Sequence, residues 1–120
     1  MLIRSQDRIA IINVDNVFNI SVRDINGTTV IHIGSPSSCC IIAEYSAKAK
    51  AMKVLDMIQE AYADFEASKI TSTGLATAAY TGSYDTPESV AGGIKALKGY
   101  AEIIKKSVVF QMPADSEVEV

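Results

Sequence analysis

The sequence predicts an α+β fold: an antiparallel four-stranded meander packed on a long helix, followed by a C-terminal helix and a short strand. Three observations support this. Apolar and polar residues alternate with period two in the first 45 residues, a helical period follows over 47–67, and a second apolar stripe covers 87–106. Strands that precede helices favour this class over a doubly wound parallel sheet. A pleckstrin-like half-barrel closed by the helix is one form it can take.

Four segments of the first 45 residues predict strands: 9–14, 18–24, 28–33 and 39–45. Asn26-Gly27 separates the second from the third and predicts a type I′ hairpin turn, which needs positive φ at both residues. The predicted register pairs Ile20 with Ile33 and Val22 with Ile31, so that apolar side chains share one face. A slip of one residue would break this match.

Residues 47–67 predict the long helix, with Ser46 as its N-cap. Its apolar residues recur at steps of three and four. They are Ala47, Ala51, Val54, Leu55, Ile58, Tyr62 and Phe65. Residues 67–85 are rich in Ala, Ser, Thr and Gly without a clear period, and they predict a flexible loop.

A second helix is predicted to begin at Thr86-Pro87, because Thr is a suitable N-cap and Pro is favoured at the first helical position. Its apolar stripe consists of Val90, Ile94, Leu97, Ala101 and Ile104. The segment 107–113 then predicts a strand that ends at Pro113.

Length and composition indicate one globular domain over residues 1–120. Hydrophobic residues make up 48% of the chain and charged residues 21%, and the net charge is −3. The acidic tail 114–120 is expected to fray in solvent. We find no signal-peptide pattern and no apolar run long enough to cross a membrane, so a cytoplasmic protein without a membrane partner is expected.

The only histidine, His32, and the only two cysteines, Cys39 and Cys40, could indicate a metal or redox site. Zinc needs about four such ligands, and adjacent residues of a strand point to opposite faces. We therefore interpret the cysteines as small hydrophobic residues of a half-buried strand, and His32 as lying on the polar face of its strand. No cofactor or metal is predicted, and no catalytic constellation indicates an enzyme.

A basic group is the one candidate binding site. It consists of Arg4, Arg8, Lys48, Lys50 and Lys53. Lysines on a helix usually form a solvated face, and the negative net charge disfavours nucleic acid as a partner. A small regulatory nucleic-acid-binding protein is therefore kept as the alternative function.

Four motifs resemble a family of small uncharacterised prophage-type proteins of Gram-positive bacteria. The matching segments are Ile3 to Arg8, Asn13 to Val17, Glu44 to Ile58 and Phe110 to Pro113, where the family has an IRSQDK-like start and a Y-x-M-P-like end. The long stretch 67–106 departs from the family pattern. The resemblance implies a compact domain of strands and a helix, and it implies no activity or catalytic residues.

Together these observations favour a non-enzymatic protein-interaction or assembly module of phage or mobile-element origin. A homo-oligomer is expected, because the apolar content is high for 120 residues and an open meander leaves edge strands unpaired. The sequence does not identify any further protein partner.

Overall fold

In the computed structural model, the described residues are 1–17, 19–34, 39–81 and 87–119. They form two compact units, and the prediction of one domain over residues 1–120 stays a prediction. We call Met1–Tyr62 with Val109–Val120 the sheet unit, and Ala63–Val108 the helical unit. The fold class is α+β, as predicted.

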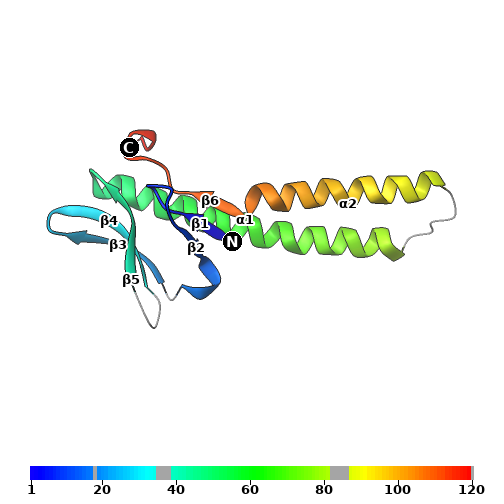
Figure 1. Cartoon of the computed structure of the whole chain (residues 1–120), viewed down its shortest axis with the longest axis horizontal. Helices are drawn as coiled ribbons and strands as arrows, with labels where there is room; N and C mark the ends of the chain where they lie inside the picture. Colours follow the sequence, from blue (N-terminus) through cyan, green and yellow to red (C-terminus); the bar gives the residue numbers. More distant parts are fainter. Residues whose placement is uncertain (18, 35–38, 82–86, 120) are drawn as a thin grey trace. The chain divides into compact units, whose positions relative to one another are not determined.

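The first sheet of the sheet unit is antiparallel and has the order β3-β4-β5 (Figure 1). Its strands are β3 (Asn19–Ile25), β4 (Thr28–Gly34) and β5 (Cys39–Tyr45). The predicted register is confirmed, since Ile20 pairs with Ile33 and Val22 with Ile31. The turn has φ values of 52° at Asn26 and 82° at Gly27, as a type I′ turn requires.

The second sheet has the order β2-β1-β6 and replaces the predicted fourth strand of the meander. Its strands are β1 (Leu2–Arg4), β2 (Ile11–Asn13) and β6 (Val109–Gln111). The prediction that residues 9–14 pair within the meander is wrong, because β2 pairs with β1. A 3-10 turn, η1 (Val14–Asn16), separates β2 from β3, and β6 pairs with β1 in parallel.

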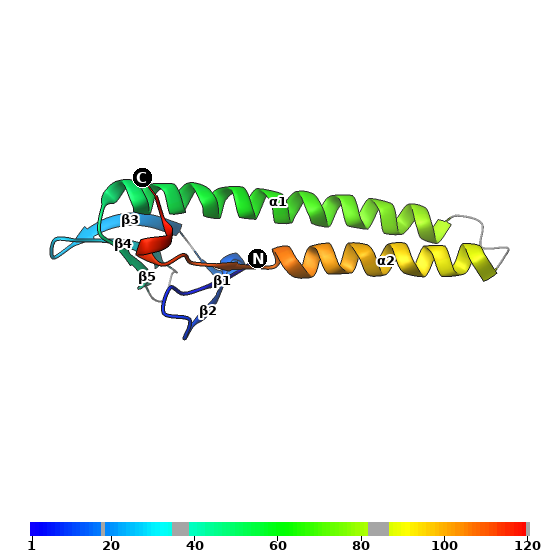
Figure 2. The same cartoon turned by 90° about the horizontal axis from the view of Figure 1, so that it is seen from above.

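The first half of the helix α1 (Lys48–Thr81) packs on the β3–β5 sheet, where Leu55 lies near Ile20 of β3. Its buried residues include Ala51, Val54 and Ile58, which confirms the predicted stripe. Ile58 lines a shallow hollow together with Ile20 of β3, so the stripe faces the apolar side of the hairpin. Figure 2 shows the first turns of α1 over this sheet.

The helical unit is an antiparallel pair formed by the second half of α1 and by α2 (Pro87–Ser107) (Figures 1 and 2). The flexible loop expected over 67–85 is helical up to Thr81, and 82–86, with the expected N-cap Thr86, lie outside the described residues. Between 67 and 81 there is no proline and Gly74 is the one glycine, so nothing there breaks a helix, and packing against α2 stabilises the extension.

The acidic tail also differs from its expected frayed state. It forms the 3-10 turn η2 (Asp115–Glu117), and the Val118 side chain is only 5% exposed. Buried Met112 precedes this turn, and its N–H donates to the Arg4 carbonyl at 3.0 Å. Apolar burial on both sides of η2 therefore holds the tail against the sheet unit.

Candidate functional site

The residues first considered for metal or redox chemistry lie apart from any ligand cluster. Within the ranges that the structure describes, no three His, Cys, Asp or Glu side chains come together as a metal site would require. His32 is buried, not on a polar face as predicted, because the central strand β4 is covered on both sides. Cys39 and Cys40 are exposed free thiols at the start of β5, which corrects their half-buried assignment.

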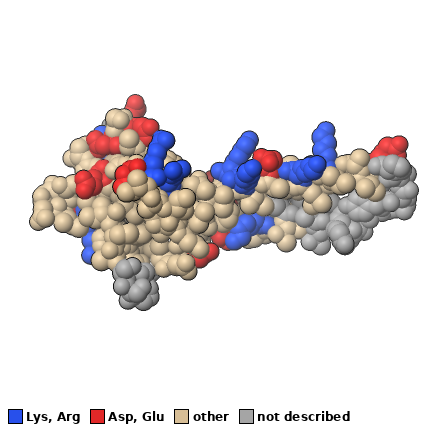
Figure 3. Space-filling view, viewed as in Figure 1, with Lys and Arg blue, Asp and Glu red and all other residues tan. Residues whose placement is uncertain are grey.

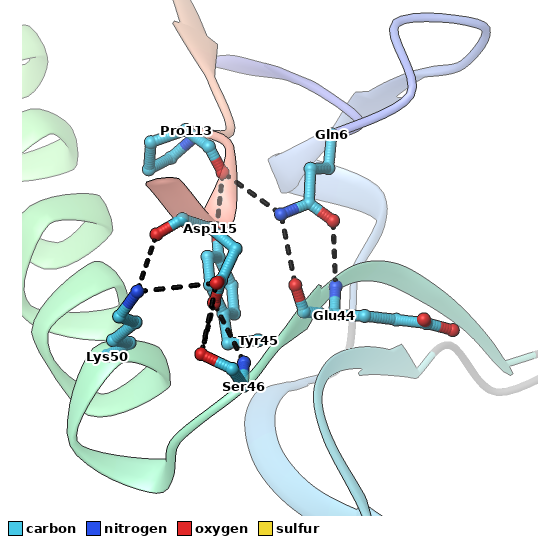
Figure 4. A network of polar contacts seen from close by, with 7 residues as sticks. All are labelled: Gln6, Glu44, Tyr45, Ser46, Lys50, Pro113 and Asp115. Atoms are coloured by element: carbon cyan, nitrogen blue, oxygen red, sulfur yellow. Dashed lines mark hydrogen bonds and ion pairs between the residues drawn. The ribbon is translucent and has the colours of Figure 1, made fainter. Parts of the chain in front are cut away.

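An extended polar arrangement among the described residues of the sheet unit joins the turn after β1, the end of β5, the start of α1 and the C-terminal segment (Figure 4). We call it the C-terminal clamp. Its residues are Gln6, Glu44, Tyr45, Ser46, Lys50, Pro113 and Asp115. The clamp links residues up to 107 positions apart in the chain.

Gln6 closes the outer edge of β5. Its side-chain Nε2 donates to the Glu44 carbonyl at 3.1 Å and to the Pro113 carbonyl at 3.2 Å, and its Oε1 accepts from the Glu44 N–H at 2.9 Å. Its backbone N–H donates to the Ile42 carbonyl, at the point where the β4–β5 register shifts. The amide thus pairs with β5 as a neighbouring strand would, and it covers an edge that could otherwise pair with another chain.

Asp115 binds the start of α1. Its carboxylate accepts from the Ser46 N–H at 2.8 Å, from the Ser46 hydroxyl at 3.0 Å and from Lys50 Nζ at 3.3 Å. The backbone hydrogen bond is the main cause that holds the pKa of Asp115 below its ordinary value, and the Ser46 hydroxyl and Lys50 add to it. A carboxylate is also favoured at a helix N-terminus. Ser46, predicted as the N-cap, instead serves to bind this tail.

Tyr45 adds a buried contact to the clamp. Its hydroxyl donates to the Pro113 carbonyl at 2.9 Å, so that this carbonyl accepts from both Tyr45 and Gln6. Burial raises the pKa of Tyr45, and the charges of Asp115 and Glu117 raise it further. The hydroxyl therefore stays protonated and acts as a donor.

The basic group predicted from the sequence is divided among separate partners. Arg4 Nε donates to the carbonyl of Arg8, whose φ is 67°. Lys50 donates to the Asp115 carbonyl at 2.8 Å, and Lys53 to the Glu119 carbonyl at 2.8 Å. Lys48 is exposed on the first turn of α1. Two of the three lysines thus bind the acidic tail of their own chain.

Apolar side chains form the other notable surface. In the helical unit, the large apolar residues that stay exposed are Ile70, Val90, Ile94, Leu97 and Ile103. In the sheet unit, Ile9 is 86% exposed beside β2. In the part of the chain that the structure describes, no helix has the length and apolar character to span a membrane.

Comparison of the chain with protein-family models, curated proteins and solved structures gave no match. The resemblance to prophage-type proteins therefore stays a prediction. Sequence reasoning missed the clamp, because Gln6 and Pro113 carry no local signal of their pairing. One signal was present in the sequence: the three lysines early in the helix and the acidic tail carry opposite charges and attract each other.

Proposed function

We propose that this chain is a non-enzymatic interaction module that assembles with further copies of itself. The exposed apolar side chains of the helical unit carry the proposal. Ile94 is 50% exposed and Val90 42%, although both belong to the main apolar stripe of α2. Burial of such surface is worth roughly 25 cal/mol per Å², and closed two-fold dimers are the commonest way to achieve it.

The engaged lysines support this function over nucleic-acid binding. Phosphate contacts need free cations, and Lys50 and Lys53 already bind the tail of their own chain. If a polyanion bound this chain, the described lysines of α2 would be the cations for it to contact. Figure 3 shows blue side chains spaced along this helix. They are Lys95, Lys98, Lys105 and Lys106.

Light scattering coupled to gel filtration tests the proposal over a range of micromolar concentrations. We expect a mass near twice the chain mass of 12.8 kDa, or a higher multiple. A mass that stays at the single-chain value at every concentration would contradict self-assembly. A gel shift with duplex and single-stranded DNA at low salt is the second arm: we expect no retardation, and retardation that salt abolishes would favour the nucleic-acid alternative.

The phage or mobile-element origin belongs to the same proposal. It rests on the sequence motifs alone. Genes for virion assembly or lysogeny next to this one would support the origin, and housekeeping genes on both sides would count against it.

A further inference from the structure

The outer edge of β3 carries backbone groups that point away from its own sheet. β3 is the last strand in the order β3-β4-β5. In an antiparallel pair, every second residue turns its N–H and C=O toward the neighbouring strand. The two-residue turn makes Ile25 and Thr28 a hydrogen-bonded pair. By this alternation, the backbone groups of Ile20, Val22 and Asp24 point outward.

The two edges of this sheet are treated differently. At the β5 edge, the outward groups of Glu44 bind the Gln6 amide, and the Ile42 carbonyl accepts from the Gln6 N–H. Among the described residues, no such partner binds the outward backbone groups of β3. The strand has no proline, no lysine and no register shift against β4, which are devices that protect an edge. The β3 edge is therefore open to an added strand.

An apolar hollow lies beside this open edge. Its lining residues are Val14, Ile20, Leu55, Ile58, Gln59 and Tyr62. Its volume of about 400 Å³ lies in the range of sites that hold a bound group. Residues that face each other on neighbouring strands place their side chains on the same face. A residue opposite Ile20 on an added strand would therefore direct its side chain into the hollow.

We infer that the β3 edge binds an extended segment of another protein, which adds a strand to the sheet and inserts an apolar side chain into the hollow. Main-chain hydrogen bonds and a side-chain pocket are the two components of recognition by strand addition. A second copy of this chain does not fit the same place. Since α1 lines the hollow, pairing the β3 strands of two copies would bring two copies of α1 to one edge. This surface is thus separate from the proposed self-assembly.

Charges near the two ends of the edge favour basic residues at the ends of the bound segment. Asp24 lies near one end, and exposed Asp15 follows Val14 of the hollow near the other. The ion pairs among the described residues include neither carboxylate. Arg23 lies on the opposite face of β3, where its Nε donates to the Ser21 hydroxyl. Lysine or arginine at the ends of the segment would complement the two carboxylates.

Fluorescence anisotropy with synthetic peptides tests this inference on the full chain. The probe is Lys-Thr-Val-Thr-X-Thr-Val-Thr-Lys, with phenylalanine, leucine, alanine or aspartate at X. Phenylalanine or leucine should give a Kd in the micromolar range, and alanine or aspartate should raise it more than about tenfold. Glutamate in place of both terminal lysines should weaken binding several-fold. Failure of all these peptides to bind at about 1 mM would overturn the inference.

Methylation of the peptide backbone tests whether the segment binds as a strand. The residue opposite Ile20 turns its N–H toward β3, and so do the residues two positions before and after it. N-methylation at X or at either valine should therefore abolish binding. N-methylation at the central threonines should leave the Kd within about twofold, because their N–H groups point away from β3. Equal effects of the two sets would contradict strand addition.

A substitution on α1 tests the hollow itself. Gln59→Trp should occupy the hollow and raise the Kd of the phenylalanine peptide by more than about tenfold. Glu60→Trp is the matched control, because Glu60 is equally exposed and does not line the hollow. Circular dichroism verifies that both variants keep their helices. An unchanged Kd in folded Gln59→Trp would overturn the role of the hollow.

Light scattering on the same variants separates this inference from the proposed function. An oligomer that persists in Gln59→Trp while the peptide is lost supports a binding surface distinct from self-assembly. An oligomer that is lost in Gln59→Trp but kept in Glu60→Trp would identify a second copy as the occupant of the edge, which overturns the inference and leaves self-assembly standing.

Discussion

Replacement of Gln6 by alanine should be among the most destabilising single changes at the surface of the sheet unit. Its side-chain amide makes three hydrogen bonds, at 2.9, 3.1 and 3.2 Å, to the backbones of Glu44 and Pro113. A hydrogen bond of this kind contributes about 0.5–1 kcal/mol net where water can partly replace it. We therefore expect Gln6→Ala to lower the free energy of unfolding by about 1.5–3 kcal/mol.

Urea titration followed by far-UV circular dichroism measures this change. Gln59→Ala is the matched control, because Gln59 is exposed on α1 and alanine favours the helix, so its effect should stay within about 0.5 kcal/mol. Gln6→Glu should cost as much as Gln6→Ala: it keeps the acceptor for the Glu44 N–H but turns a carboxylate toward two carbonyl oxygens. A Gln6→Ala value equal to that of Gln59→Ala would refute the role of Gln6 in closing the β5 edge.

Three further predictions concern stability. Gly27→Val should lower the free energy of unfolding by more than about 1 kcal/mol, since a β-branched residue resists the φ of 82°, whereas Thr28→Val in the strand should be nearly neutral in the same titration. The pKa of Asp115 is lowered in the folded chain, so its contribution to stability is full above the ordinary pKa of 3.8 and is lost as the pH falls through the lowered value. Asp115→Asn should therefore weaken the fall of the melting temperature at acid pH, and an unchanged fall would contradict the contact between Asp115 and the start of α1. Gly99→Ala should add about 1 kcal/mol in the titration, because a Cβ there meets no atom within 4 Å, and a loss would indicate close packing at that site.

The elements that the sequence predicts well are those with local chemistry. Asn26-Gly27 permits a turn with two positive φ values, and the hairpin register follows from it. The short strands β1 and β6 leave no such signal: they pair in parallel across most of the chain, with three residues each, so period and turn rules cannot find them. Once β1 has β6 as a neighbour, β2 takes its other edge, and the four-stranded meander is lost.

The basic group shows why a site cannot be predicted from one segment alone. Lys50 and Lys53 are recognisable as cations on a helix, but their partners come from Asp115 and Glu119, more than sixty residues later. Because these partners lie so far apart in the sequence, the ordered structure of the tail could not be predicted from the tail alone. The lysines that the sequence presents as a binding surface make contacts within their own chain in the structure.

The apolar stripe of α2 could be predicted from the sequence, but its exposure could not. Helical spacing predicted this stripe, and in the structure Val90, Ile94 and Leu97 stay more than a third exposed. Ile104, the last residue of the stripe, is partly covered. The covered side of α2 combines small residues with larger ones, since Tyr100 and Ile103 line a shallow groove with Ala67 of α1. Small residues permit close approach of a neighbouring helix, but they bury little area. Val90, Ile94 and Leu97 thus keep apolar area that the described part of the chain does not bury, and no local rule of the sequence predicts how much of a stripe its own chain will cover.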